Sequence, residues 1–339
     1  MASDETGPDV ALSVVVPCFN EEDVVGTLHA RLSAACRDGV GDRYEIVLVD
    51  DGSTDQTWSF IRDLAQRDSH IVGLRLSRNH GHQLALTAGL SSCRGALILI
   101  IDADLQDPPE LLPDMMRLVR QGADVVYGQR VSRAGESWHK RATASLFYRI
   151  LRTLTDVPIP PDTGDFRLMT RRALDVLQSM PEQHRFIRGM VSWIGFHQVP
   201  IEYDRAERFA GATKYPFHRM LRLAIDAITG FSTRPLRLSL YLGGLLGLTS
   251  VVLLAYTLYS WLFLDVVHGW TSLMGVVLMM GCAQMLMLGI MGEYLGRLYM
   301  QSKHRPLFVI ADVARMQESV APSRSVPRLV DVRQGSRNT

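Results

Sequence analysis

The sequence predicts an α/β protein with a mostly parallel, doubly wound sheet, followed by two apolar helices that cross a membrane. In the first hundred residues, short aliphatic segments alternate with helical patterns, which is typical of a parallel sheet with helices on both faces. Acidic and turn-forming residues follow these segments. Beyond residue 234, two long stretches contain no Asp, Glu, Lys or Arg. The chain therefore divides into a polar N-terminal domain and an apolar C-terminal part.

The composition excludes several classes of protein. The chain has 339 residues and a formal net charge of +1, so it has no overall positive field for nucleic acid. Its four cysteines, at positions 18, 36, 93 and 282, show neither metal-ligand nor disulfide spacing and are typical of free thiols in a reducing compartment. Residues 1–10 are polar and acidic, so we expect them to be disordered and not to form a signal peptide.

Aliphatic runs predict four strands, and helical periodicity predicts a helix after each of the first three. Asn20 is expected to cap a helix over residues 21–37, and Ser53 or Thr54 to start the second helix, which continues through Leu64. The third helix is expected from about residue 82 to residue 91. The predicted strands are residues 11–17, 44–49, 71–76 and 97–101.

The fourth predicted strand ends in two carboxylates, Asp102 and Asp104. Its five consecutive aliphatic residues predict burial on both faces, and ligands of open α/β sheets bind at the carboxyl edge where it ends. Two carboxylates one residue apart repel each other unless a cation lies between them, and oxygen ligands suit Mg²⁺ or Mn²⁺. A polar turn is the alternative, because Asp is common in turns and two prolines follow at 108 and 109.

Polar residues after the other three strands are expected at the same edge of the sheet. They are residues 17–21, the pair Asp50 and Asp51, and residues 79–82. An Asp after the second strand is where a Rossmann-type sheet holds a ribose or a base. No G-x-G-x-x-G follows the first strand and no G-x-x-x-x-G-K-[ST] occurs in the sequence, which argues against dinucleotide and P-loop binding. The pattern favours a nucleotide-sugar held by carboxylates and a divalent metal.

Three of these segments carry a family resemblance: VPCFNE at 16–21, VDDGSTD at 49–55 and DADLQDPPE at 102–110. They resemble the inverting glycosyltransferases of family 2, which have a GT-A fold. More closely, the chain looks like the polyprenyl-phosphate glycosyltransferases, the dolichol-phosphate mannose synthases and bactoprenol glucosyltransferases. The resemblance spans roughly residues 12–308 and implies a GT-A domain over residues 11–215. Further matches are GQR at 128–130, TGDFR at 163–167 and RFAGATK at 208–214.

The resemblance also implies roles for individual residues. It implies three metal ligands for Mg²⁺ or Mn²⁺, which are Asp102, Asp104 and Gln106. It implies catalytic roles for Asp165, Asp104 and Arg130, and contacts with a lipid phosphate for Arg130, Arg141 and Ser145. The residues that it implies for the nucleotide-sugar are Pro17, Phe19, Glu21, Val49, Asp50, Asp51, Asp102, Ala103, Arg208 and Lys214.

Chemistry leaves some of these roles open. A lipid phosphate has its second pKa near 6 and is largely deprotonated at neutral pH, so Asp165 need not act as a base. It could instead orient a sugar hydroxyl or hold a neighbouring arginine such as Arg167. Arg208 and Lys214 could be a solvated pair, but Gly211 between them suggests a mobile loop that closes over the nucleotide. The segment RFIRG at 185–189 could help to bind the acceptor, although we interpret it as a structural turn.

Two amphipathic stretches are expected to lie on the membrane surface. Residues 138–154 have basic residues at 140, 141, 149 and 152 among aliphatic and aromatic ones, a pattern typical of interfacial helices. An ordinary surface helix packed on the sheet is the alternative. Residues 216–235 form the second stretch and are expected to be a juxtamembrane helix.

The apolar C-terminal part predicts two transmembrane helices over about residues 237–264 and 271–296, within a membrane region at 236–299. The first uncharged run covers about 27 residues, and a bilayer helix needs roughly 20. Basic residues flank the pair at 234, 237, 297, 303 and 305, so the positive-inside rule places the catalytic domain and both termini in the cytoplasm, at the inner cell membrane.

Glycines along both helices allow close packing and self-association, for example as a tetramer. The tail at 300–339 is expected to be cytoplasmic, and disordered from about residue 311.

The leading hypothesis is a membrane enzyme that transfers one sugar from a nucleotide-sugar to a polyprenyl phosphate, with inversion, at the cytoplasmic leaflet. UDP-glucose is the favoured donor; GDP-mannose or a UDP-amino sugar are alternatives. A processive polysaccharide synthase is disfavoured because the sequence has no Q-x-x-R-W motif and few membrane helices. The hypothesis from another class is a non-catalytic membrane scaffold that retains the fold.

Overall fold

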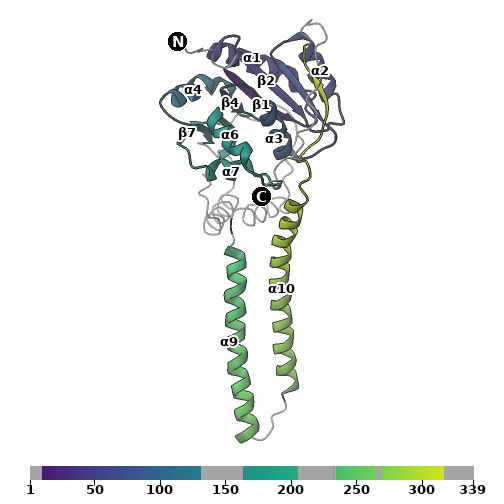
Figure 1. Cartoon of the computed structure of the whole chain (residues 1–339), viewed down its shortest axis with the longest axis vertical. Coiled ribbons are helices and arrows are strands. Elements are labelled where there is room, and N and C mark those ends of the chain that lie inside the picture. Colours follow the sequence, from purple (N-terminus) through teal and green to yellow (C-terminus); the bar gives the residue numbers. More distant parts are fainter. Residues whose placement is uncertain (1–9, 131–162, 205–231, 233, 264–268, 317–339) are drawn as a thin grey trace, which may run out of the picture.

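The computed structural model describes residues 10–130, 163–204, 232, 234–263 and 269–316, and shows an α/β domain from which two long helices extend (Figure 1). One eight-stranded sheet runs through the domain in the order β7-β5-β6-β4-β1-β2-β3-β8. The strands are β1 (Leu12–Cys18), β2 (Tyr44–Asp50), β3 (Ile71–Leu76), β4 (Leu97–Ile100), β5 (Val125–Arg130), β6 (Thr163–Thr170), β7 (Gln198–Tyr203) and β8 (Ile310–Ala314).

The central strands are parallel, and each of the four predicted strands is present. β1 pairs in parallel with both β2 and β4, and β2 pairs in parallel with β3. β6 is antiparallel to both β4 and β5, whereas β7 is parallel to β5. Because β6 runs against β4 and Arg167 pairs with Ile100, the first residues of β6 extend just beyond the end of β4. This reversal brings residues from the second half of the domain to the predicted ligand edge.

Alternate side chains of the central strands enter two cores, one on each face of the sheet. Val14 and Val16 belong to the core that is covered by α1 (Val25–Val40), α2 (Thr57–Arg67) and α4 (Leu112–Arg120). Val15 belongs to the other core, which is covered by α3 (His82–Ser92), α6 (Arg171–Ser179) and α7 (Ile187–Trp193). A short 3-10 helix, η1 (Pro109–Leu111), precedes α4. The prediction of a doubly wound sheet is therefore confirmed.

The predicted starts of the first two helices are wrong. The predicted capping residues, Asn20 in the loop after β1 and Ser53 and Thr54 in the loop after β2, hydrogen-bond with one another. α1 begins at Val25 and α2 at Thr57. Asn20 has a positive φ of 55°, and its Oδ1 accepts a hydrogen bond from the Thr54 backbone N–H at 2.9 Å. The Asn20 N–H donates to the Ser53 hydroxyl at 3.0 Å. The loops after β1 and β2 are neighbours at the sheet edge, so these side chains join two loops and leave the helix ends uncapped. The third helix begins at residue 82 as predicted.

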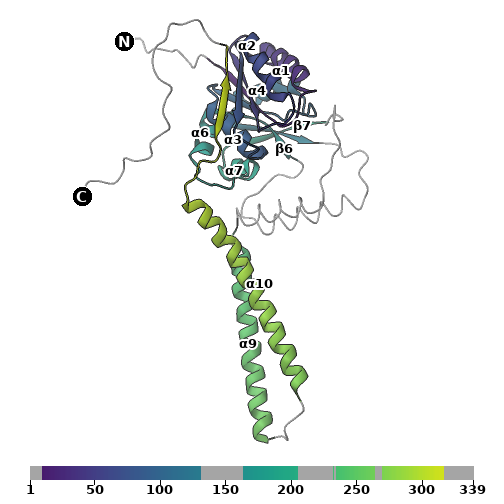
Figure 2. The ribbon, with the colours of Figure 1, turned by 90° about the vertical axis from the view of Figure 1, so that its right-hand side faces the viewer.

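The predicted disorder from residue 311 is wrong for the part of the tail that the structure describes. Residues 310–314 form β8, which pairs antiparallel with β3 at the edge of the sheet (Figure 2). The Ser77 N–H donates to the Val309 carbonyl at 2.9 Å, and Phe308 packs against the second core. Residues 308–314 are therefore part of the N-terminal domain.

The two long helices, α9 (Arg234–Phe263) and α10 (Trp270–Ser302), lie side by side and project from the domain (Figures 1 and 2). Within α10, residues 275–302 are long and apolar enough to cross a bilayer. Among the described side chains of α9, the continuous apolar stretch is Tyr241–Tyr256, so a spanning pair stays a prediction. The expected amphipathic stretch at 138–154 and nearly all of that at 216–235 lie outside the described residues.

Candidate active site

The carboxyl ends of β1, β2 and β4 meet at one edge of the sheet, as the sequence predicts. Cys18 is paired with Asp50, and Val15 with Ile100, in the parallel registers of these strands. Ile100 is also paired with Arg167 of antiparallel β6. This register places Asp165, two residues earlier on β6, beside the loop that begins at Asp102.

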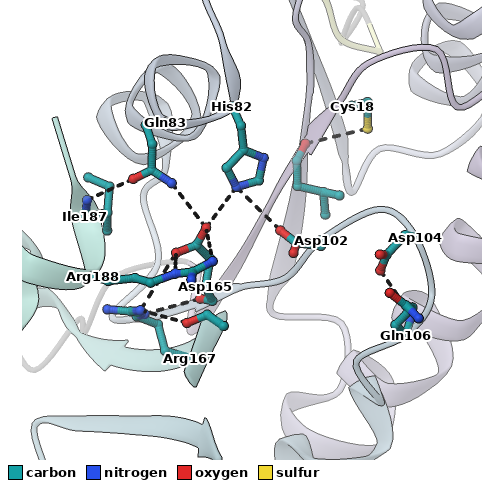
Figure 3. A network of polar contacts seen from close by, with 12 residues as sticks. Cys18, His82, Gln83, Asp102, Asp104, Gln106, Asp165, Arg167, Ile187 and Arg188 are labelled. Carbon is teal, nitrogen blue, oxygen red and sulfur yellow. Dashed lines mark hydrogen bonds and ion pairs between the residues drawn. The ribbon is translucent and has the colours of Figure 1, made fainter. Parts of the chain in front are cut away.

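Asp165 is the centre of a buried polar cluster (Figure 3). Only 1% of the residue is exposed. Arg188, from the first turn of α7, donates from Nε to Oδ1 at 2.8 Å and from Nη2 to Oδ2 at 3.3 Å. From the start of α3, Gln83 Nε2 donates to Oδ2 at 3.2 Å, and His82 Nε2 lies 3.0 Å from the same oxygen. Three elements that are distant in the sequence therefore converge on this carboxylate.

Arg167 lies next to this carboxylate, as the sequence analysis considered. Its Nη2 donates to the Gly164 carbonyl at 3.0 Å and its Nε donates to the Asp165 carbonyl at 3.2 Å. Its Nη2 is 3.9 Å from Asp165 Oδ1. Burial lowers the pKa of the Arg167 guanidinium to about 10, and the Asp165 charge offsets only part of that effect. A buried cation therefore accompanies the buried anion on the same strand.

These neighbours keep Asp165 ionised. Burial alone would raise the pKa of its carboxyl, but the Arg188 charge and the hydrogen bonds from His82 and Arg188 hold that pKa well below its usual range. Burial would also lower the pKa of His82, yet its hydrogen bond with Asp165 and the charges of Asp165 and Asp102 raise it. A carboxylate held so firmly in its charged form is a poor proton acceptor. The geometry suits orientation better than general base catalysis.

Asp102 is the carboxylate that best fits a cation. Its Oδ1 is buried and accepts no hydrogen bond from the described part of the chain; its nearest cationic neighbour is His82 Nε2 at 3.6 Å. Burial, together with the charges of Asp165, Asp107 and Asp104, raises the pKa of Asp102 to about 6, against the opposing charge of His82. A buried carboxylate oxygen without a donor is costly. A divalent cation at this oxygen would remove that cost.

Asp104 and Gln106 lie farther along the same loop (Figure 3). Asp104 Oδ1 accepts a hydrogen bond from the Gln106 backbone N–H at 3.2 Å, and Leu105 between them has a positive φ of 58°. This tight turn keeps the Asp104 carboxylate close to the strand end. Carboxylate oxygens, the ligand type that Asp102 and Asp104 carry, suit Mg²⁺ or Mn²⁺.

A second set of possible ligands lies nearby but fits a metal less well. One ligand atom each from His82, Asp102 and Asp165 lie within 4.8 Å of one another. The His82 nitrogen and both Asp165 oxygens are engaged in the hydrogen bonds given above, and the Arg188 guanidinium lies against the same carboxylate. A guanidinium in that place repels a cation. We therefore regard this trio as an ion-pair cluster.

The two acidic residues at the end of β2, Asp50 and Asp51, hold loops in this structure. Asp50 is fully buried and accepts from the Ser53 N–H at 3.1 Å. The oxygens of Asp51 accept from the N–H groups of His80 and Gly81 at 2.7 and 2.9 Å, which fixes the turn immediately before α3. Burial nevertheless raises the pKa of Asp51. These contacts place His82 and Gln83 at the site.

Other predicted contacts for the nucleotide differ in exposure. Phe19 is 44% exposed at the sheet edge, whereas Val49 is buried in the second core. Pro17 and Ala103 are also buried, and the Glu21 N–H donates to the Thr57 hydroxyl at 2.8 Å. Phe19 is therefore the predicted side chain best placed to stack on a base. Val49 could contact a ligand only through its backbone.

Arg130 lies at the end of β5, close to the start of β6. Its Nε donates to the Tyr203 hydroxyl at 3.4 Å, and that hydroxyl donates to Asp107. A Cβ on Gly164 would be 2.9 Å from Arg130 Nη2. The guanidinium therefore passes directly over Gly164, adjacent to Asp165. Four predicted residues, Arg141, Ser145, Arg208 and Lys214, lie outside the described residues.

Two family models match the chain. One is described as glycosyl transferase family 2 and matches residues 13–177; the other is described as the GtrB C-terminal hairpin and matches residues 234–298. The uncharacterized glycosyltransferase YkcC of Bacillus subtilis (strain 168) is 44% identical over 302 residues, which are 89% of this chain and 93% of that protein. The chain belongs to glycosyltransferase family 2.

The enzyme is also similar to proteins that have a more specific name. A prophage bactoprenol glucosyl transferase homolog of Escherichia coli (strain K12) is 38% identical over 310 residues, 90% of the enzyme and 99% of that protein. The bactoprenol glucosyl transferase of Shigella phage SfV is 38% identical over 305 residues, 88% of the enzyme and 97% of that protein. The resemblance indicated by the sequence motifs is therefore confirmed, with its GT-A fold and its glycosyltransferase activity.

The sequence placed the loop that contains His82 at the ligand edge, but it indicated neither the contacts of His82 and Gln83 with Asp165 nor the role of Arg188. The segment at 185–189 was interpreted as a structural turn, yet its second arginine is the principal ion-pair partner of Asp165. The available signal was a pair of arginines on either side of two apolar residues. Nothing in the sequence indicated that α7 would lie against β6.

Proposed function

We propose that this glycosyltransferase transfers a single sugar from a nucleotide-sugar to a polyprenyl phosphate, with inversion at the anomeric carbon. The observation that carries the proposal is the position of Asp102, whose Oδ1 is buried without a hydrogen-bond donor among the described residues, beside the Asp165–Arg188 ion pair. The two sides of this site have different chemistry. One suits a metal-bound diphosphate, and the other suits an anionic acceptor.

On the donor side, Asp102, Asp104 and Gln106 would hold Mg²⁺ or Mn²⁺. When bound, such an ion neutralises the charge that develops on the leaving diphosphate. Phe19 would stack on the base, with Pro17, Glu21, Val49, Asp50, Asp51 and Ala103 around the nucleoside. Arg208 and Lys214 would add positive charge around the diphosphate.

On the acceptor side, Arg130, Arg141 and Ser145 would bind the lipid phosphate. A phosphate oxygen attacks the anomeric carbon from the face opposite the leaving diphosphate, the bond to the diphosphate breaks, and the configuration inverts. The phosphate is largely deprotonated near neutral pH, so no base is required. Asp165, held ionised by Arg188, would orient a sugar hydroxyl. Holding the two reactants in line supplies most of the rate.

The acceptor and the C-terminal helices together favour a membrane location. α9 and α10 would span the inner membrane as a hairpin, with the catalytic domain and both termini in the cytoplasm. Similarity to proteins named bactoprenol glucosyl transferases favours undecaprenyl phosphate as acceptor and UDP-glucose as donor. GDP-mannose and UDP-amino sugars are the alternative donors. Glycines along both helices favour a homo-oligomer such as a tetramer.

The test is sugar transfer by the purified full-length protein in lipid vesicles. Radiolabelled nucleotide-sugars are supplied one at a time with undecaprenyl phosphate and Mn²⁺ or Mg²⁺. We expect a lipid-linked product that carries one sugar, forms with UDP-glucose, and disappears when EDTA is added. If no nucleotide-sugar of a broad panel gives a lipid-linked product, the proposal is wrong and the non-catalytic scaffold is favoured.

A further inference from the structure

Gln301, near the end of α10, hydrogen-bonds to the catalytic domain. Its Oε1 accepts from the Gln183 backbone N–H at 2.9 Å, and its Nε2 donates to the Pro181 carbonyl at 2.7 Å. Both partners belong to the segment between α6 and α7, residues 180–186, which we name the connector. In return, Gln183 Nε2 donates to the Arg305 carbonyl at 3.2 Å. Residues more than a hundred positions apart are thus joined by three hydrogen bonds.

The Gln301 contact requires the chemistry of a primary amide. One atom accepts from a backbone N–H while the other donates to a backbone carbonyl two residues away. Glutamate can accept but cannot donate when ionised, and lysine can donate but cannot accept. Asparagine has both groups but is one methylene shorter. The side chain at this position therefore matches the two backbone groups it meets.

The chain that follows α10 is attached to the domain at its other end as well. Phe308 packs against the second core, the Ser77 N–H donates to the Val309 carbonyl, and residues 310–314 extend the sheet as β8. The end of the helix is therefore held at the connector and again at β3. Movement of α10 relative to the domain would be transmitted to the connector.

The connector leads directly into the site. It ends at α7, where the Ile187 N–H donates to Gln83 Oε1 at 2.8 Å. The same Gln83 donates to Asp165 from its other amide atom, and Arg188 is the next residue (Figure 3). On the α6 side, Arg185 bonds the carbonyls of Leu177 and Met180. The short segment from Gln183 to Arg188 is therefore held by hydrogen bonds at both ends.

We propose that Gln301 is a positioning residue that joins the membrane helix to the Arg188–Asp165 pair through the connector. This inference rests on the proposed function, in which that pair lies on the acceptor side of the reaction. Through these hydrogen bonds, α10, the helix proposed to span the bilayer, is linked by the connector to Arg188, which pairs with the residue proposed to orient the substrate. Delivery of a lipid acceptor along the membrane surface and alignment of the site would then depend on one rigid connection.

The kinetic test compares Gln301→Ala with Ser302→Ala in full-length protein in vesicles. Ser302 is the matched control, because its hydroxyl donates only to the Tyr299 carbonyl within α10. We expect Gln301→Ala to lower kcat about three- to tenfold, as the loss of two ordinary hydrogen bonds would, with the KM for the nucleotide-sugar changed less than about twofold. Gln301→Glu, which keeps only the acceptor, should be intermediate. Equal losses in the Gln301→Ala and Ser302→Ala variants would overturn the inference.

The double variant tests whether Gln301 acts through Arg188. If it does, Gln301→Ala causes no further loss of kcat in an Arg188→Ala background. The same fold-loss in both backgrounds would show that Gln301 acts by another route.

A second measurement does not depend on turnover or on folding of the Arg188 variant. Amide hydrogen exchange over residues 183–188 should be faster in Gln301→Ala than in wild type, and unchanged in Ser302→Ala. Unchanged exchange in Gln301→Ala overturns the inference. Absence of transfer by wild type instead contradicts the proposed function and leaves the exchange result to decide the connection.

Discussion

Arg188 makes a two-point contact with Asp165, with Nε 2.8 Å from Oδ1 and Nη2 3.3 Å from Oδ2. The carboxylate comes from β6 and the guanidinium from α7, and both side chains adjoin the metal-compatible loop at Asp102 (Figure 3). Such a bidentate pair, with a buried carboxylate, fixes direction as well as charge. In the proposed function this pair aligns the acceptor and a sugar hydroxyl, and this role predicts how the site responds to substitution.

Asp165→Asn should lower both transfer and stability. The substitution removes the anion that faces Arg188 and Arg167, and breaking one side of a buried ion pair costs about 3 kcal/mol. Loss of alignment should reduce kcat by about 100-fold. Thermal unfolding and initial rates in vesicles measure the two effects. A variant with wild-type kcat would remove Asp165 from the site.

The pH profile of that variant separates orientation from proton transfer. The acceptor phosphate is a dianion above pH ~6 and a weaker, monoanionic nucleophile below it. The rate of wild type should therefore fall as pH decreases through about 6. The pKa of Asp165 is held far below this range, so the same fall should remain in the residual activity of Asp165→Asn. Loss of the pH dependence in the variant would instead identify Asp165 as a base.

Asp104→Asn should abolish transfer while the protein stays folded. Removing a charged metal ligand costs several kcal/mol of transition-state stabilisation, or about 100-fold in rate or more. The control is Asp114→Asn, a half-exposed carboxylate of α4 that pairs only with Arg117 among the described residues; it should keep wild-type activity. Full activity of Asp104→Asn at low Mn²⁺ concentration would exclude the proposed metal site.

Arg141→Ala should weaken use of the lipid phosphate more than use of the donor. Arg141 is proposed to bind the acceptor phosphate, and a charge-assisted hydrogen bond contributes about 1.5–3 kcal/mol, so the apparent KM for undecaprenyl phosphate should rise about tenfold or more. The KM for the nucleotide-sugar is the internal control and should change less than about twofold. An unchanged acceptor KM would show that Arg141 does not contact the phosphate.

The contribution of β8 can be measured with neighbouring substitutions. Ala314 is 8% exposed and paired with Gly73, whereas Val313 is 50% exposed. Ala314→Asp should lower the free energy of unfolding by about 2 kcal/mol, because it buries a carboxylate that has no hydrogen-bond or ion-pair partner. Val313→Asp on the other face should change it by less than about 0.5 kcal/mol. Equal effects of the two variants on thermal unfolding would indicate that β8 does not pair in this register.

Asp68 should give the catalytic domain a measurable acid sensitivity. Burial would raise its pKa, but the His70 N–H and the side chains of His29 and His70 lower it from 3.8 to about 2. Because the folded-state pKa is depressed, the stabilisation is present above pH ~4 and is lost as pH falls toward 2. Asp68→Asn should destabilise the protein by about 1–2 kcal/mol at pH 7, with the difference from wild type shrinking in acid. A constant difference between pH 7 and pH 3 would contradict this assignment.

The sequence predicted the central sheet because its strands are nearly pure aliphatic runs. Residues 12–18 and 44–50 are buried along their entire length, so hydrophobic pattern and structure agree there. It could not predict where α1 and α2 begin, because Asn20 and Ser53 satisfy a neighbouring loop instead of a helix end. Which groups these side chains bond depends on which strands are adjacent in the sheet, and the local sequence does not carry that information.

The same limit applies to the site and to the tail. The motif at 102–106 could be recognised in the sequence from its paired carboxylates. Arg188, in contrast, contacts Asp165 only because α7 packs against β6. The sequence did not predict β8, because the strand is short and four of its five residues are exposed at the edge of the sheet. Both depend on contacts between segments that are far apart in the chain.

The most direct test of the account is a structure of the full-length enzyme with Mn²⁺ and a nucleoside diphosphate. The account predicts the ion at the carboxylates of Asp102 and Asp104, bridging to the diphosphate, with the Arg188–Asp165 pair intact beside it. An ion held by His82 and Asp165 with Arg188 displaced, or a nucleotide bound with no ion at Asp102, would contradict it.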